Sequence, residues 1–243
     1  RLRAPGRVAL LAPMYAEHAK AWRQAGHVVR ELPAEALLAA TDADVVVLAS
    51  PNNPTGERVA PNDLLALQAR QPAGAWLVVD EAFVDATPEL SLAHHCPRPG
   101  LIVLRSLGKF FGLAGARVGF VLAWPALLER LAAALGPWAV SGPSRWAAAL
   151  ALTDGAWIAR SRARLVRDSA RLAPLLPVHA LPPPGGCARS QGVCTARAGA
   201  LHEALAGRGI LPRLFDTPAS LRFGLPGTAA DWRRLDQALA AAD

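Results

Sequence analysis

Lysine is almost absent from this sequence. Only two of its 26 basic residues are lysines, Lys20 and Lys109, and all the others are arginines. Arginine stays protonated in proteins, whereas a partly buried lysine can lose its proton and form a Schiff base. A lysine retained in such a sequence therefore indicates chemistry that arginine cannot perform.

Cysteine is scarce as well, and the three residues present are Cys96, Cys187 and Cys194. No two of them have the spacing of a metal-ligand pair, and the adjacent His94 and His95 cannot share one face of a helix. We therefore expect no metal site, and we expect reduced thiols in a cytoplasmic protein.

Long apolar runs without charge are also missing. The longest candidate, Leu131–Ser144, is interrupted by Gly136 and Pro137, and no signal peptide is recognised, so contact with a membrane is not expected. The formal net charge of +7 comes from arginine. The densest arginine cluster has the spacing of a solvated helix face and lacks any motif for nucleic-acid binding: Arg160, Arg162, Arg164, Arg167 and Arg171.

The sequence does contain an alternation of short apolar strands with helices, which predicts an α/β protein with a mostly parallel sheet. Strands are expected at Val8–Ala12, Val28–Leu32, Val45–Ala49, Trp76–Asp80, Ile102–Arg105 and Val118–Leu122, and helices at Glu17–Ala25, Ala34–Ala40, Pro61–Arg70 and Pro143–Leu172. Further on, the sequence predicts a break at 182–186, a helix at Ala200–Ala206, strands at Ile210–Leu214 and Leu221–Phe223, and a final helix capped by Thr228 and Asp231. We therefore expect a large domain over residues 1–153 and a small α+β domain over residues 154–243.

Polar side chains follow three of the predicted strands. Asn53, Asp80 and Ser106 each lie just past a strand end. Because open parallel sheets bind ligands outside the carboxyl ends of their strands, these side chains are expected to converge. An aspartate at this place can pair with a pyridine nitrogen, and an amide can hydrogen-bond a ring oxygen. A capping role for Asp80 and a simple turn at Asn53 are the alternatives.

Two residues that suit a phosphate flank the lysine. Ser106 lies three residues before Lys109 and Arg117 eight residues after it, in a glycine-rich segment. A lysine, a carboxylate and a phosphate site together indicate pyridoxal phosphate, an aldehyde cofactor with one phosphate arm. The alternatives are an ordinary turn serine at Ser106 and a surface ion pair at Arg117.

Jointly, these motifs resemble the class I/II aminotransferase superfamily of fold-type I pyridoxal-phosphate enzymes. The motifs are Asn53-Pro-Thr-Gly56, Asp80-Glu-Ala-Phe83, and Ser106-x-x-Lys109 followed by Arg117. The resemblance implies helices on both faces of the sheet, a cytoplasmic homodimer, and pyridoxal 5'-phosphate bound covalently by Lys109. It also implies that Asp80 pairs with the pyridine nitrogen, that Asn53 binds the ring 3-oxygen, and that Ser106 and Arg117 bind the phosphate.

The same resemblance implies further binding residues. It places Tyr15 against the cofactor ring and His18 beside Asp80; packing at the start of a helix and an exposed histidine are the alternatives. Arg222, in Leu-Arg-Phe-Gly, is expected to bind the α-carboxylate of the substrate, because a bidentate arginine fork suits that anion. Arg213 is expected to bind a substrate phosphate, unless it is solvated.

Two families within the superfamily are the most similar to this sequence: the threonine-phosphate decarboxylases of cobalamin biosynthesis and the histidinol-phosphate aminotransferases. Phe83 and the segments 105–115, 137–141 and 221–226 favour the decarboxylases. The expected reaction is therefore decarboxylation of the small phosphorylated amino acid L-threonine O-3-phosphate to aminopropanol phosphate. The residues alone do not decide between decarboxylation and transamination, and a non-catalytic scaffold is a further alternative.

The sequence departs from the family pattern at three places. Phe83 stands where most aminotransferases have tyrosine, which removes one hydrogen bond to the ring 3-oxygen. Residues 186–197 are less apolar than the strand that the family has there, so we expect local irregularity. The sequence begins without methionine at a predicted strand, so we expect it to lack the N-terminal segment that carries the family's phosphate-binding turn.

Overall fold

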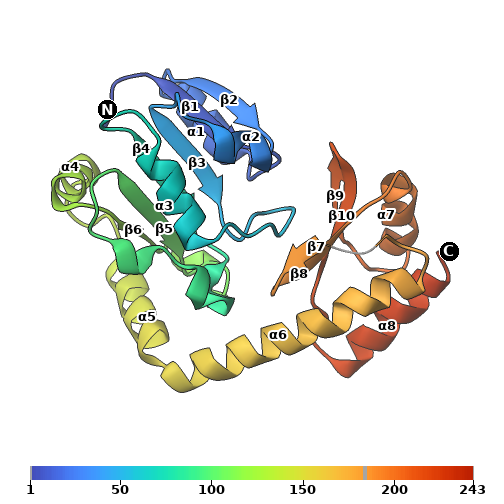
Figure 1. The fold of residues 1–243 in the computed structure, drawn as a ribbon. Coiled ribbons are helices and arrows are strands. Elements are labelled where there is room, and N and C mark those ends of the chain that lie inside the picture. The colour runs from blue at the N-terminus through green and yellow to red at the C-terminus, as the bar shows by residue number, and fades with distance from the viewer. Residues whose placement is uncertain (1, 183–184, 243) are drawn as a thin grey trace. The chain divides into compact units, whose positions relative to one another are not determined.

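The chain divides into two compact units, and the computed structural model describes its residues 2–182 and 185–242 (Figure 1). Unit 1 contains Arg1–Asn53 and Arg58–Ile158, and unit 2 contains Pro54–Glu57 and Ala159–Asp243. Each unit has a sheet and a hydrophobic core of its own. Among the described residues, no helix combines the length and the apolar character that crossing a membrane requires.

Unit 1 is built on a six-stranded sheet with the order β2-β1-β3-β4-β5-β6. Its strands are β1 (Arg7–Leu11), β2 (Val28–Leu32), β3 (Val45–Ala49), β4 (Trp76–Asp80), β5 (Leu101–Ser106) and β6 (Gly119–Leu122). Strands β1 to β5 run parallel to one another, and β6 pairs antiparallel with β5. The predicted mostly parallel sheet is therefore confirmed.

Helices cover both faces of this sheet, because its central strands are apolar on both sides. The helices of unit 1 are α1 (Glu17–Gln24), α2 (Ala34–Ala39), α3 (Pro61–Ala69), α4 (Pro125–Leu135) and α5 (Gly142–Thr153). Strand β3 buries all five of its residues, and successive side chains point to opposite faces. Val46 and Leu48 share a core cluster with α2 and α3, whereas Val45 and Val47 share another with α1 and α4.

Unit 2 packs three helices on one face of an antiparallel sheet with the order β7-β8-β10-β9. Its elements are α6 (Gly155–Val178), β7 (Gly185–Cys187), β8 (Ser190–Cys194), α7 (Ala198–Ala206), β9 (Arg213–Asp216), β10 (Ala219–Gly224) and α8 (Ala229–Ala240). Val193, Leu221 and Phe223 join the core that the helices form. Because Arg213 and Arg222 are direct cross-strand partners, their side chains share a face of the sheet.

The single long helix expected over residues 143–172 is wrong, since the structure has two helices that are separated at Asp154. The backbone of Asp154 is non-helical (φ −79°, ψ 74°), and its Oδ1 accepts a hydrogen bond of 2.9 Å from Trp157 N. This side chain caps the start of α6 in the way that Asp commonly does. Helix α6 then continues beyond the predicted end, through Pro174 and Pro177.

The segment 186–197, where irregularity is expected, contains a regular hairpin of β7 and β8. The strands pair antiparallel, and a Cβ at Gly186 would lie 2.4 Å from Ser190 O, so the close approach requires glycine. Only Gln191 and Val193 of β8 are buried, which explains the low apolar content of this strand. The break expected at 182–186 falls partly on residues 183 and 184, which lie outside the described residues.

Two other expected elements of unit 2 have different outcomes. The strand expected at Ile210–Leu214 begins only at Arg213, because Pro212 has no N–H to donate to the sheet. The capping box is confirmed: Thr228 Oγ1 accepts from Asp231 N at 3.2 Å, and Asp231 Oδ2 accepts from Thr228 N at 3.0 Å.

Candidate active site

The carboxyl ends of β3, β4 and β5 form one wall of a cavity in unit 1. Ala49, Asp80 and Leu104 lie side by side in the sheet register, and the polar residues follow at these strand ends. The cavity measures about 310 Å³ and is lined by Tyr15, Ala49, Asn53, Asp80, Ala82, Phe83, Leu104, Arg105, Ser106 and Lys109. The structure thus brings together five of the residues expected to bind a cofactor. All of them belong to unit 1.

Asp80 is held in a fixed orientation by two hydrogen bonds. Its Oδ1 accepts from Ala82 N at 2.9 Å, and its Oδ2 lies 2.8 Å from His18 Nε2 on α1. Both side chains are mostly buried. His18 therefore lies beside Asp80, as the resemblance implies, and its ring meets that of Tyr15 edge to face at a centroid distance of 6.0 Å. A carboxylate fixed in this way can pair with a cationic N–H of a ligand in the cavity.

Lys109 carries an amine that is not neutralised by any carboxylate in the described part of the chain. Its Nζ lies 5.6 Å from the centroid of the Phe83 ring. In contrast, Lys20 is exposed and lies 3.6 Å from Glu17 Oε2. An amine at a cavity wall without a carboxylate partner is open to a ligand aldehyde. The two lysines of this chain thus have different surroundings.

Of the two adjacent asparagines, only Asn53 lines the cavity. Asn52 is buried, and its Nδ2 donates a hydrogen bond of 2.9 Å to Pro13 O. This donation holds the chain that leaves β3 against the segment that follows β1. Asn52 therefore has a structural partner, whereas Asn53 lines the cavity that Asp80 and Lys109 also line.

Arg117 lies in a second cavity rather than in the cavity of Lys109. This cavity measures about 210 Å³ and shares Ser106 with the first one. Arg117 has the left-handed backbone that non-glycine residues rarely adopt (φ 53°), and its Nη1 donates to Ala114 O at 3.2 Å. Ser106 Oγ accepts from Gly108 N at 3.1 Å. The serine lies where the two cavities meet, so a ligand bound beside it can reach both.

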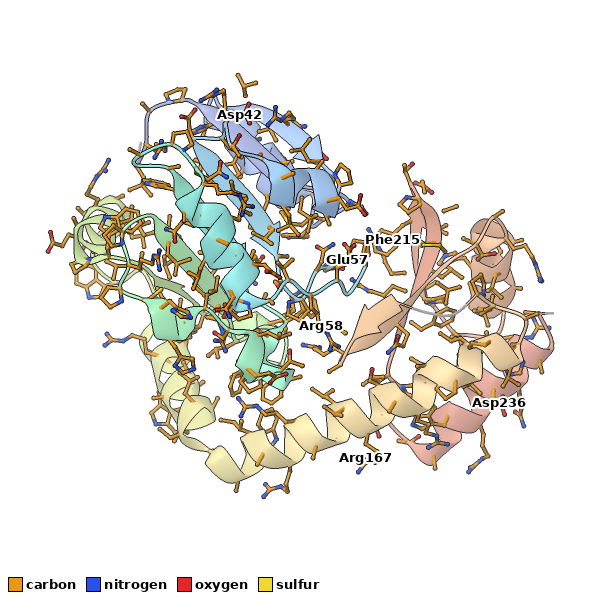
Figure 2. All side chains as sticks on the ribbon, in the orientation of Figure 1. Asp42, Glu57, Arg58, Arg167, Phe215 and Asp236 are labelled. Carbon is orange, nitrogen blue, oxygen red and sulfur yellow. The ribbon has the colours of Figure 1, made fainter. Side chains whose placement is uncertain are left out.

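Two further arginines expected at the site belong to unit 2. The guanidinium carbons of Arg213 and Arg222 lie 5.8 and 5.7 Å from the ring centroid of Phe215, which Figure 2 labels. Burial lowers the pKa of the Arg222 guanidinium, and the charge of Arg213 lowers it further, while Cys187 raises it. Two adjacent cations on one face of a sheet suit a ligand with two anionic groups.

A cluster of buried charges lies next to the cavity and was not predicted from the sequence. Glu81 is fully buried and is hydrogen-bonded to Ser91, and Arg105 pairs with both Glu81 and Asp85. The acidic residue after Asp80 and the arginine before Ser106 were visible in the motifs, but nothing in their spacing indicates that they meet. Only the pairing of β4 with β5 brings them together.

Comparisons with known proteins show which family the chain resembles. Residues 2–239 match the family described as aminotransferase class I and II. A threonine-phosphate decarboxylase of Pseudomonas aeruginosa is 55% identical over 98% of this chain and 73% of its own length. A histidinol-phosphate aminotransferase of Aeromonas hydrophila is 42% identical, but over only 46% of this chain and 32% of its own length.

A solved structure shares the fold across nearly the whole chain. The histidinol-phosphate aminotransferase of Sinorhizobium meliloti, in complex with pyridoxal-5'-phosphate, superposes with a TM-score of 0.85. It is 24% identical, and the match covers 99% of this chain and 71% of that protein. At this identity the likeness shows the fold alone.

Proposed function

Because this chain belongs to the aminotransferase class I and II family, we propose that it is a threonine-phosphate decarboxylase that uses pyridoxal 5'-phosphate. The reaction converts L-threonine O-3-phosphate to aminopropanol phosphate and carbon dioxide for cobalamin biosynthesis. The observation that carries this proposal is the 55% identity to a relative of that name, sustained over 98% of the chain. The likeness to the aminotransferase of Aeromonas hydrophila stops at less than half of it.

The residues of the Lys109 cavity fit the cofactor group by group. Lys109 offers an amine for the aldehyde carbon, and the carboxylate of Asp80 is oriented for the pyridine nitrogen. Asn53 lines the same cavity and is proposed to hydrogen-bond the ring 3-oxygen, a role that Phe83 cannot share because it has no hydroxyl group. When bound, pyridoxal phosphate supplies an electron sink for the bond that breaks at the α-carbon.

Phosphate binding is proposed for the region where the two cavities meet. Ser106 lines both cavities, and Arg117 lines the second. A hydroxyl and a guanidinium on adjacent walls suit a phosphate arm that extends from a ring in the first cavity. Tyr15, whose edge-to-face contact with His18 fixes it near Asp80, is proposed to pack against the face of that ring.

Lys109 is also suited to act after the α-carboxylate has left as carbon dioxide. The α-carbon must then receive a proton, and Lys109 carries the only amine among the residues that line this cavity. We propose that its Nζ holds this proton and delivers it to the α-carbon. Binding and proton transfer are thus assigned to one side chain.

Arg222 is proposed to hold the substrate carboxylate, and Arg213 the substrate phosphate. We expect Arg222→Lys to lower kcat/KM for threonine phosphate by roughly tenfold to hundredfold, because an ammonium cannot bind a carboxylate in a bidentate way and hydrogen bonds to charged groups contribute about 1.5–3 kcal/mol. Steady-state kinetics measures this loss. Arg167→Lys is the control, because this side chain is exposed on α6 (Figure 2), and it should leave kcat/KM unchanged. Equal losses in both variants would contradict the role of Arg222.

Substrate assays test the proposed reaction itself. Threonine phosphate has an α-carboxylate to lose, whereas histidinol phosphate has none and needs 2-oxoglutarate as a second substrate. We expect the protein to release carbon dioxide from threonine phosphate without any added keto acid. Amino transfer from histidinol phosphate to 2-oxoglutarate, with no carbon dioxide from threonine phosphate, would instead identify a histidinol-phosphate aminotransferase. That second candidate is favoured by the partial match to the Aeromonas hydrophila protein.

We propose that unit 1 corresponds to the cofactor domain expected over residues 1–153, and unit 2 to the small domain expected over residues 154–243. A homodimer is proposed because unit 1 exposes large apolar side chains around α5. Trp138 is 91% exposed, and Trp146 and Leu150, which share a face of α5, are 68% and 52% exposed. A cytoplasmic location is proposed, which agrees with the three free cysteines.

A further inference from the structure

A buried group of charges adjoins the proposed cofactor site; we name Glu81, Asp85, Ser91 and Arg105 the Arg105 cluster. Glu81 has no exposed surface. Its Oε2 accepts from Ser91 Oγ at 2.6 Å, and Arg105 Nη1 lies 3.4 Å from both of these oxygen atoms. Arg105 Nη2 pairs with Asp85 Oδ1. One guanidinium therefore bridges two carboxylates.

The Arg105 cluster is linked to the proposed cofactor ligands through the backbone. Glu81 directly follows Asp80, and Arg105 directly precedes Ser106. Glu81 N also donates a hydrogen bond of 2.9 Å to Leu104 O, which continues the pairing with β5 one residue past the end of β4. Asp80 and Ser106 are thus the chain neighbours of Glu81 and Arg105, the two residues that this ion pair joins.

We propose that Arg105 is a positioning residue of the proposed cofactor site: by bridging Glu81 and Asp85, it fixes the separation of Asp80 from Ser106. This inference rests on the proposed function, in which Asp80 and Ser106 bind opposite ends of one ligand. Because the arm that joins the ring to the phosphate is short, the two ends can separate only within a limited range, and affinity depends on two strand ends that are already in place.

A gain in the free energy of unfolding does not by itself explain such a cluster. Burial raises the pKa of the Glu81 carboxyl, while the hydrogen bonds from Ser91 and Leu92 and the charge of Arg105 oppose this effect. Well-packed apolar side chains in place of a buried ion pair are often as stable or more stable. Apolar contacts, however, are not directional, whereas the planar fork of arginine binds two carboxylates in fixed directions.

The test compares cofactor affinity between the wild-type protein and the triple variant Glu81→Gln/Asp85→Asn/Arg105→Met. The triple variant removes all three charges, so no carboxylate is left buried without its cation. We expect the Kd for pyridoxal phosphate, measured by absorbance titration of the cofactor-free protein, to rise by about tenfold, as when an orienting partner of a ligand-binding group is lost. We also expect the absorbance maximum of the bound cofactor to shift, since the contact of Asp80 with the ring changes.

A matched control removes an ion pair of the same type elsewhere in unit 1. Arg30 Nη2 lies 2.6 Å from Asp42 Oδ1, and both side chains are exposed (Figure 2 labels Asp42). The variant Arg30→Met/Asp42→Asn should bind pyridoxal phosphate with the wild-type Kd. A rise in Kd that is equal in the control and in the triple variant would overturn the inference.

The remaining outcomes are also decisive. A wild-type Kd and an unchanged absorbance spectrum in the triple variant would overturn the positioning role and leave the proposed function standing. A wild-type protein that does not bind pyridoxal phosphate would overturn both. If the triple variant does not fold, Ser91→Ala replaces it, because this change removes the hydrogen bonds that Ser91 makes with Glu81 and Arg105 without removing a charge. An unchanged Kd there would likewise overturn the inference.

Discussion

Replacing Lys109 with alanine is expected to abolish turnover of threonine phosphate, while Lys20→Ala is expected to retain wild-type turnover. The loss in kcat should be about 10⁴-fold or more, as for removal of other covalent catalytic groups. Lys20 is a matched control, since it is the only other lysine and is held on the surface by Glu17. Release of carbon dioxide measures both effects.

Chemical labelling tests the same lysine independently of turnover. In the wild-type protein, borohydride should reduce the link between lysine and cofactor and leave a stable label, which peptide mapping should locate on Lys109. Lys109→Ala should lose this label but retain part of its affinity for the cofactor, through Ser106 and Arg117. A label on Lys20, or wild-type protein without the visible absorbance of a lysine-bound cofactor, would reject the assignment.

Asp80→Asn is expected to have the second largest effect. Asparagine keeps the size of the side chain, and its Oδ1 can still accept the hydrogen bond from Ala82 N. Its Nδ2 can only donate, so the change removes the negative charge together with the oxygen that faces His18 Nε2. Without that charge the ring nitrogen is no longer held protonated, and the electron sink weakens. We expect kcat to fall by roughly 10²- to 10³-fold, or about 2.7–4 kcal/mol, as for other electrostatic deletions in active sites.

A second aspartate supplies the control for this experiment. Asp42 is exposed, and the side chain of Arg30 lowers the pKa of its carboxyl, chiefly by hydrogen bonding. Asp42→Asn should leave kcat unchanged, because this aspartate lies at the start of β3, away from the carboxyl ends of the strands. Near-normal turnover by Asp80→Asn would show that its carboxylate does not pair with the ring.

Local sequence signals were sufficient for the strands of unit 1. Val45–Ala49 and Trp76–Asp80 have the predicted bounds, because unbroken apolar runs of this length fit a strand that is buried on both faces. The capping box at Thr228 was predictable for a similar reason, since its two partners are three residues apart. Helix α4, in contrast, was not predicted, and the continuous helix predicted over 143–172 is interrupted where Asp154 caps a new one.

The sequence by itself determined the family and the chemical types of the proposed cofactor ligands. These depend on short motifs, which are defined by residue types and by the number of residues between them, as in Ser106-x-x-Lys109. Such spacings can be read directly from the sequence and require no tertiary contact. For the same reason, the sequence could indicate Lys109 rather than Lys20.

Tertiary structure decided which of these side chains meet and what supports them. It set Arg117 in an adjoining cavity that shares Ser106, and it joined Glu81 to Arg105. Residues 24 positions apart, such as these last two, meet only because β4 and β5 are parallel neighbours, and the register of that pairing depends on a core that many residues share. Local sequence does not contain such a register, because each strand can pair acceptably at several alignments until the packing of the whole sheet selects one.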